Sequence, residues 1–98
     1  SEIDMIKKHI QEYWVMAGVP RKIPSFELKI KTLSDGSVIS VEIVDEERYK
    51  NSDSYFRSIV DSAVRAIDDA SPIPFPPKKY KFFKNFKFTF NPSEMAKG

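Results

Sequence analysis

Two runs of alternating hydrophobic and polar residues, separated by an Asp-Gly pair, constrain the fold of this chain more than any other feature. In residues 26–31 and 39–43 every second side chain is hydrophobic: Phe26, Leu28 and Ile30, then Ile39, Val41 and Ile43. A period of two is that of a strand with one buried face. Asp35-Gly36, within residues 34–37, tolerates the positive φ that tight turns require. The pattern therefore predicts a β-hairpin whose hydrophobic residues share one face.

Hydrophobic residues also recur at helical spacing on both sides of this hairpin. Steps of three and four predict an amphipathic helix with the following stripe: Ile3, Ile6, Ile10, Tyr13, Trp14 and Ala17. A second helix is predicted by a similar stripe: Phe56, Ile59, Val60, Ala63, Ile67 and Ala70. We expect Gly18 and Pro20 to end the first helix, and Ser52 or Asp53 to cap the second. Trp14 is expected to be buried, and residues 45–51 are expected to form a polar loop.

A proline-rich segment separates the second helix from the last part of the chain. Four prolines within residues 72–77 exclude a helix or a central strand, which predicts a stiff, extended connector. The connector leads to a last strand, predicted by the alternation of Phe86, Lys87, Phe88, Thr89 and Phe90. We expect Asn91-Pro92 to end this strand and the following residues to be frayed.

The order helix, strand, strand, helix, strand predicts one α+β domain over residues 1–98, which is too short for two domains. The hairpin makes its two strands antiparallel, and the second helix carries the chain back to the starting end. The last strand is then antiparallel to the first strand alone. This predicts a three-stranded antiparallel sheet in the order 2-1-3, with both helices on one face and the phenylalanine strand at an edge.

The chain offers little from which to build an enzyme or a metal site. It has no cysteine, which excludes disulfides and thiolate ligands. His9 is the only histidine, and we interpret it as a solvated helix residue. Asp45, Glu46 and Glu47 lack the spacing and the glycine of a calcium loop. We therefore expect no catalysis, no cofactor and no metal.

The C-terminal part of the chain is locally basic. Residues 78–98 contain six lysines and one glutamate, interleaved with aromatic residues. Such a pattern can bind single-stranded nucleic acid by stacking and phosphate attraction. However, Phe86, Phe88 and Phe90 share the face that must cover the helices, and lysine on an edge strand discourages uncontrolled sheet pairing. A small basic nucleic-acid-binding domain is thus the alternative, and its affinity would fall steeply with salt.

Several short motifs occur in a characteristic order along the chain: Tyr13-Trp14, Ser34-Asp35-Gly36-Ser37-Val38, Ser71-Pro72-Ile73-Pro74 and Phe83-Lys84-Asn85-Phe86, followed by Phe88-Thr89-Phe90-Asn91-Pro92. In this order they resemble the C-terminal domains of TolA-type proteins, within the TonB/TolA C-terminal group. The resemblance covers residues 3–92. TolA domains often carry a cysteine pair that this sequence lacks, so TonB itself is a close competitor.

The resemblance implies a periplasmic protein-interaction domain of a Tol-Pal system. Its expected partners are TolB-like proteins, with Pal as a further candidate, and it would be exploited by colicins and phage coat proteins but would bind no nucleic acid. No apolar run reaches the roughly 18 residues of a membrane span. Because the chain opens with Ser1 rather than Met, we expect a piece of a longer protein. The resemblance implies an inner-membrane protein whose anchor lies outside these residues, and we expect this piece to be a monomer.

The edge strand is where we predict partner binding. Its unpaired backbone groups offer hydrogen bonds to an extended partner segment, which would add as a further strand. The predicted site consists of Lys84, Asn85, Phe86, Lys87, Phe88, Thr89 and Phe90. Lys87 and Thr89 are expected to point away from the core. We further expect proline to spare the sheet at only one of these two positions.

Overall fold

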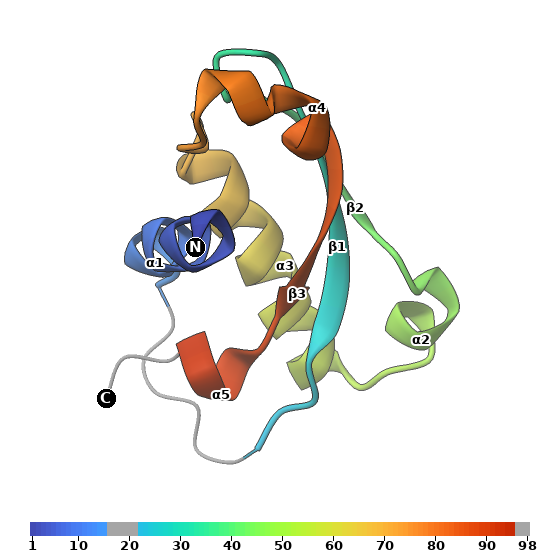
Figure 1. Ribbon diagram of the computed structural model, residues 1–98. Coiled ribbons are helices and arrows are strands. Elements are labelled where there is room, and N and C mark those ends of the chain that lie inside the picture. Colours follow the sequence, from blue (N-terminus) through green and yellow to red (C-terminus); the bar gives the residue numbers. More distant parts are fainter. Residues whose placement is uncertain (16–21, 96–98) are drawn as a thin grey trace.

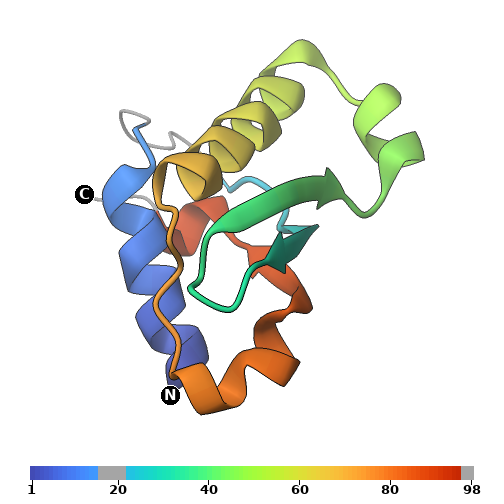
Figure 2. The ribbon, with the colours of Figure 1, turned by 90° about the horizontal axis from the view of Figure 1, so that it is seen from above.

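The computed structural model describes residues 1–15 and 22–95 and contains a three-stranded antiparallel sheet in the order β2-β1-β3. The elements are α1 (Glu2–Tyr13), β1 (Phe26–Thr32), β2 (Val38–Ile43), α2 (Glu46–Lys50), α3 (Ser54–Asp69), η1 (Pro77–Lys79), α4 (Tyr80–Phe83), β3 (Asn85–Phe90) and α5 (Pro92–Met95). The long helices α1 and α3 lie on the same side of the sheet (Figures 1 and 2). The predicted fold class, strand order and placement of the two helices are confirmed.

The hairpin turn has the predicted Asp-Gly geometry and is also a docking point for the proline-rich connector. The Gly36 N–H donates to the Leu33 carbonyl at 2.9 Å, and Gly36 has a φ of 91°. The Ile73 N–H donates to the Gly36 carbonyl at 2.8 Å, and the Val38 N–H donates to the Ser71 hydroxyl at 3.0 Å. The connector that follows α3 is therefore held against the hairpin by one hydrogen bond between backbone groups and one to a serine hydroxyl.

Replacing Gly36 with alanine is expected to destabilise the fold by about 1–3 kcal/mol, the range for a non-glycine residue held in a strained backbone conformation. The positive φ disfavours a side chain, and an added Cβ would lie 2.3 Å from the Ile73 carbonyl oxygen. Urea unfolding of the variant measures the effect. Ser34→Ala, at an exposed position of the same turn, serves as the control and should change stability by less than about 0.5 kcal/mol. Equal stability of Gly36→Ala and the parent chain would contradict this packing.

Strand β2 departs from the predicted pattern at one position. The pairing Lys31↔Ser40 is followed by Thr32↔Val38, so Ile39 is an extra residue without a partner on β1. Such a bulge interrupts the alternation of the strand. Val38 consequently packs against the core, whereas Ile39 is 60% exposed. The prediction that Ile39 shares the core face with Val41 and Ile43 is therefore wrong.

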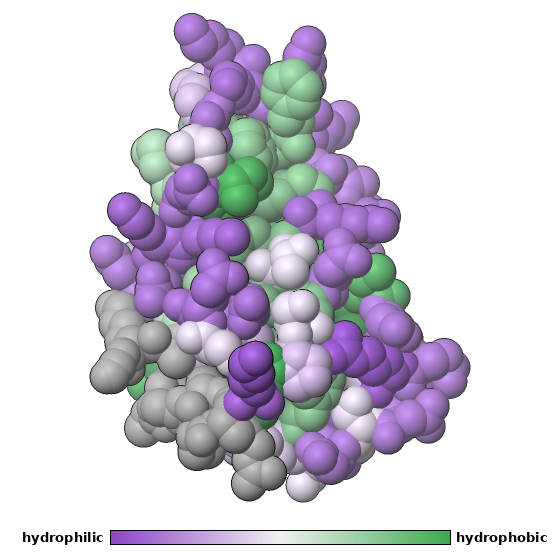
Figure 3. Space-filling model, turned by 60° about the horizontal axis from the view of Figure 1, so that its bottom comes forward, coloured by the Kyte–Doolittle hydropathy of each residue, from purple (hydrophilic) through white to green (hydrophobic). Residues whose placement is uncertain are grey.

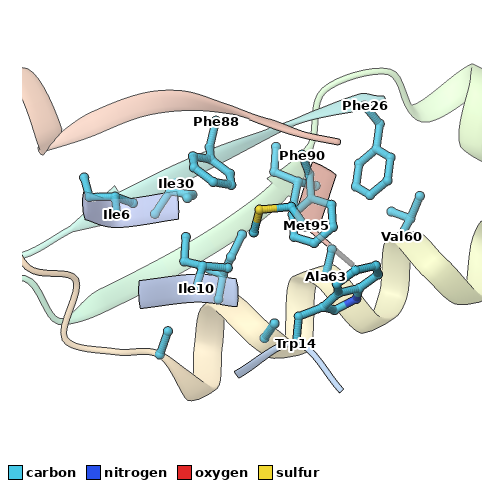
Figure 4. Close-up of a cluster of buried hydrophobic side chains, with 14 of the residues drawn as sticks. Ile6, Ile10, Trp14, Phe26, Ile30, Val60, Ala63, Phe88, Phe90 and Met95 are labelled. Atoms are coloured by element: carbon cyan, nitrogen blue, oxygen red, sulfur yellow. The ribbon is translucent and has the colours of Figure 1, made fainter. Parts of the chain in front are cut away.

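The core is built where α1, α3 and the sheet meet, and Trp14 is part of it. Figure 4 shows this side chain between α3 and Phe90 of β3. Trp14 is 6% exposed, its Nε1–H donates to the Ser62 hydroxyl at 2.8 Å, and its ring meets the Phe90 ring edge-on at 5.1 Å. The predicted burial of Trp14 is confirmed. Ile6 and Ile10 are also buried, but Ile3 and Tyr13 are exposed, so the buried stripe of α1 follows steps of four.

Helix termini explain where α2 and α3 begin. The Asp53 carboxylate accepts from the Phe56 N–H at 2.8 Å and caps α3, as one of the two predicted caps. The Asp45 carboxylate likewise accepts from the Arg48 N–H at 3.0 Å. Residues 46–50 are therefore the helix α2, and the prediction of a polar loop there is wrong. Helix α1 ends at Tyr13. The predicted stop signals Gly18 and Pro20, and Ala17 of the predicted stripe, lie outside the described residues.

Three further predictions need correction. The connector does not lead directly to the last strand, because η1 and α4 precede β3. The residues from Pro92 to Met95 are not frayed, since they form α5 and the Met95 side chain is buried. His9 is half-buried, and its Nε2–H donates to the Ala70 carbonyl at 2.7 Å, at the C-terminal end of α3.

On the face shown in Figure 3 most side chains are hydrophilic, and the hydrophobic ones gather in a strip along its middle. No helix in residues 1–15 and 22–95 has the length and apolar character needed to cross a membrane.

Candidate functional site

Strand β3 is an edge strand, as predicted. It pairs with β1 over six residues in regular register, from Phe26↔Phe90 to Lys31↔Asn85. In the described sheet, no strand lies on its other side. Its free edge is therefore as long as the strand itself.

Two hydrogen bonds outside the regular ladders show which way the backbone groups of the sheet point. The Thr32 N–H donates to the Lys84 carbonyl at 3.1 Å, and the Val44 N–H donates to the Glu27 carbonyl at 3.2 Å. Hydrogen-bonded pairs alternate along an antiparallel ladder. The even-numbered residues of β1 therefore bond to β3, and the odd-numbered ones bond to β2.

The same alternation decides the direction of the groups on β3. Phe86, Phe88 and Phe90 direct their N–H and C=O groups toward β1, because their partners on β1 are even-numbered. The N–H and C=O groups of Asn85, Lys87 and Thr89 point outward. Within the described residues, these three residues have no hydrogen bond to any other element. The outward groups form the candidate binding edge.

This geometry corrects one prediction. Lys87 and Thr89 are two residues apart, so their N–H groups face the same side of the strand. The expectation that proline spares the sheet at only one of them is wrong. Neither N–H takes part in the pairing with β1, and proline at either position removes only an outward donor.

The start of β3 is fastened to the end of β1 through Thr32. The Thr32 hydroxyl donates to the Phe83 carbonyl at 2.8 Å, and the Tyr80 hydroxyl donates to the Thr32 carbonyl at 2.9 Å. Phe83 also packs edge-on against Phe86 at 5.2 Å and stacks on Phe75 at 5.2 Å. The helical turn of α4 and an aromatic cluster thus hold the binding edge in place.

The seven residues of the predicted site divide into two groups. Phe88 and Phe90 are 2% and 0% exposed and belong to the core, while Phe86 is half-buried. Lys84, Asn85, Lys87 and Thr89 are exposed. Phe88 and Phe90 are therefore not available as a stacking platform for nucleic-acid bases, which removes the main structural support for that alternative.

Sequence comparison identifies the family to which this chain belongs. Residues 3–90 match the family described as TonB C terminal. The chain belongs to the TonB C-terminal family. A search among curated proteins finds no match.

A solved structure shares the fold of this TonB C-terminal domain. It is the solution NMR structure of TolAIII bound to a peptide derived from the N-terminus of TolB. The two chains are 23% identical, the TM-score is 0.66, and the match covers 92% of this chain and 71% of the other. At this identity the likeness establishes a common fold.

The TonB C-terminal domain has a second free edge, on β2. By the same alternation, Val41 and Ile43 direct their N–H groups away from β1. Beside this edge lies a hollow of about 410 Å³ between β2 and α3, lined in part by Val41, Ile43 and Val64. However, the bulge at Ile39 distorts this edge, and bulges are a known means of blocking strand addition. The regular edge of β3 is the better candidate.

Metal binding and acid–base chemistry find no support in the described part of this TonB C-terminal domain. Residues 1–15 and 22–95 contain no cluster of three or more potential metal ligands. The pKa of Tyr49 is raised because its hydroxyl donates to the Asp61 carboxylate at 2.7 Å. The pKa of Glu2 is lowered by its hydrogen bond from Lys79. Both pairs join helical elements to each other and lie outside β3.

Proposed function

We propose that this chain is a non-catalytic protein-interaction domain that binds an extended segment of its partner at the β3 edge. The observation that carries the proposal is the row of outward, unpartnered backbone groups at Asn85, Lys87 and Thr89. An added strand would satisfy these groups, and alternate side chains of the partner would supply specificity. Lys84, Phe86, Phe88 and Phe90 complete the proposed site by positioning this edge rather than by touching the partner backbone.

A TolB-like protein is the partner that we propose first. The support is the shared fold with TolAIII, whose solved structure holds a peptide derived from the N-terminus of TolB. On this proposal the chain is a periplasmic domain of an inner-membrane protein in a Tol-Pal system, anchored through a segment outside residues 1–98. Pal, colicins and phage coat proteins are further proposed partners that rest on the family resemblance alone.

The family match also favours a second function. Because residues 3–90 match the TonB C-terminal family, an energy-transducing domain that binds outer-membrane transporters is compatible with the same edge. Strand addition would operate in the same way in both cases, and only the identity of the partner would differ.

Titration of the ¹⁵N-labelled 98-residue chain with a synthetic peptide derived from the N-terminus of TolB separates these functions. We expect saturable changes in the amide resonances of β3. Affinity should change only modestly between 50 and 200 mM salt, whereas binding through phosphates would lose on the order of a thousandfold. Binding of a transporter-derived N-terminal peptide with no response to the TolB peptide would favour the TonB-type function. No response to either peptide would contradict the proposal.

A further inference from the structure

Three lysines on β1 and β3 lie on the face of the sheet that is turned away from the helices. We call Lys29, Lys31 and Lys87 the lysine face. On β1 and β3 these positions alternate with buried residues, so the three side chains share the open face. Lys29 is directly opposite Lys87, and Lys31 is opposite Asn85, diagonal to Lys87. The three lysine side chains thus start from neighbouring positions on two strands.

The charge of the lysine face is only partly balanced. Like charges directly opposite each other destabilise a sheet. Glu42 is opposite Lys29 on β2, and Glu27, opposite Thr89, is diagonal to Lys87 just as Lys31 is. Among residues 1–15 and 22–95 the ion pairs lie elsewhere: Ser1–Asp4, Lys7–Glu94 and Lys79–Glu2. Three lysines against these two glutamates leave an excess of positive charge on this face, nearest to Lys31 and Asn85 at the beginning of the free edge.

This positive charge determines which side chains are favourable on a strand that adds to β3. Every second side chain of an added strand lies on the open face, with its Cβ about 5 Å from that of the residue opposite. A carboxylate opposite Lys87 would relieve the repulsion between Lys87 and Lys29, whereas a lysine would increase it. Pairing of two β3 edges would bring two lysine faces together, which disfavours a second copy of this chain as the occupant.

The half-buried side chain of Phe86 complements this charge on the other face. The core-facing residues of an added strand would lie beside Phe86, where apolar side chains extend the core. We propose that the β3 edge selects an extended protein segment with acidic side chains on the open face, alternating with apolar ones on the core face. This inference rests on the proposed strand addition and specifies the chemistry of the partner.

The test compares two synthetic eight-residue peptides that have valine at alternate positions and either glutamate or lysine between them. Each is titrated into the 98-residue chain, with binding followed by the amide resonances of Asn85, Lys87 and Thr89. The glutamate peptide is expected to bind at least about tenfold more tightly than the lysine peptide. Lys87→Glu should reduce or reverse this preference. Lys50→Glu changes the net charge equally on α2, which follows the opposite edge strand, and should leave the preference intact.

The outcomes distinguish the inference from the proposed function. Equal binding of the two peptides, with both perturbing the three amides, would overturn charge selection and leave strand addition standing. Binding of neither peptide would overturn both. A loss of preference in Lys50→Glu as large as that in Lys87→Glu would also overturn the inference, because net charge would then be sufficient. If a twelve-nucleotide oligothymidylate competed with the glutamate peptide at the same amides, the edge would be a general anion site, and selection of an acidic protein segment would be overturned.

Discussion

Replacing Trp14 with alanine is expected to lower the free energy of unfolding by about 3–5 kcal/mol, the range for truncating a large buried aromatic side chain. Trp14 joins three elements, because it extends from the end of α1, donates to Ser62 of α3 and packs on Phe90 of β3. The variant loses all of these contacts and leaves a cavity in the core. Urea unfolding followed by circular dichroism measures the loss, since Trp14 is the only tryptophan available for fluorescence.

Trp14→Phe is the matched control. It keeps an aromatic ring beside Phe90 and removes the indole N–H, while the Ser62 hydroxyl still donates to the Ile59 carbonyl at 2.6 Å. We expect it to recover about half of the lost stability. A Trp14→Ala chain as stable as the parent, within about 0.5 kcal/mol, would show that α1 is not docked on the core.

Proline at Thr89 is expected to weaken partner binding by about 10- to 100-fold while the sheet remains intact. It removes one outward N–H and leaves an acceptor of the bound strand unpaired. Proline at Lys87 should act in the same way, and the double variant should abolish detectable binding. The Thr89 N–H does not bond to β1, so the circular dichroism spectrum should match that of the parent chain.

Two matched variants separate the backbone from the side chain. Thr89→Ala keeps the N–H and should bind within about threefold of the parent. Ser40→Pro removes an N–H that points toward β1 from β2 and should destabilise the sheet itself. If Thr89→Ala weakened binding as much as Thr89→Pro, the partner would be held by side chains rather than by strand addition.

The parts of the fold that local patterns encode were predictable. The alternation of Leu28 and Ile30 together with Asp35-Gly36 specifies a hairpin, and its orientation then determines the strand order. The burial of Trp14 follows from helical spacing. The edge position of β3 follows from the topology. The exposure of the Lys87 and Thr89 side chains follows from their alternation with phenylalanines.

The parts that depend on tertiary contacts were missed. Helix α2 has no buried residue of its own, and it is held by contacts with other elements, among them the hydrogen bond between Tyr49 and Asp61 and the one from Arg48 to the Ser25 carbonyl. The bulge at Ile39 is hidden from the sequence because Val38 and Ile39 are both apolar. The common direction of the Lys87 and Thr89 N–H groups was a missed signal of another kind, since the period of two that places side chains also places backbone groups.

Amide hydrogen exchange with and without a bound TolB-derived peptide tests strand addition most directly. The amides of Asn85, Lys87 and Thr89 are open to solvent in the free sheet, whereas those of Phe86 and Phe88 already bond to β1. We predict that binding slows exchange at the three odd-numbered positions much more than at Phe86 and Phe88. Selective protection of Val41 and Ile43 would instead place the partner on the β2 edge, and a bound peptide that protects neither edge would contradict strand addition altogether.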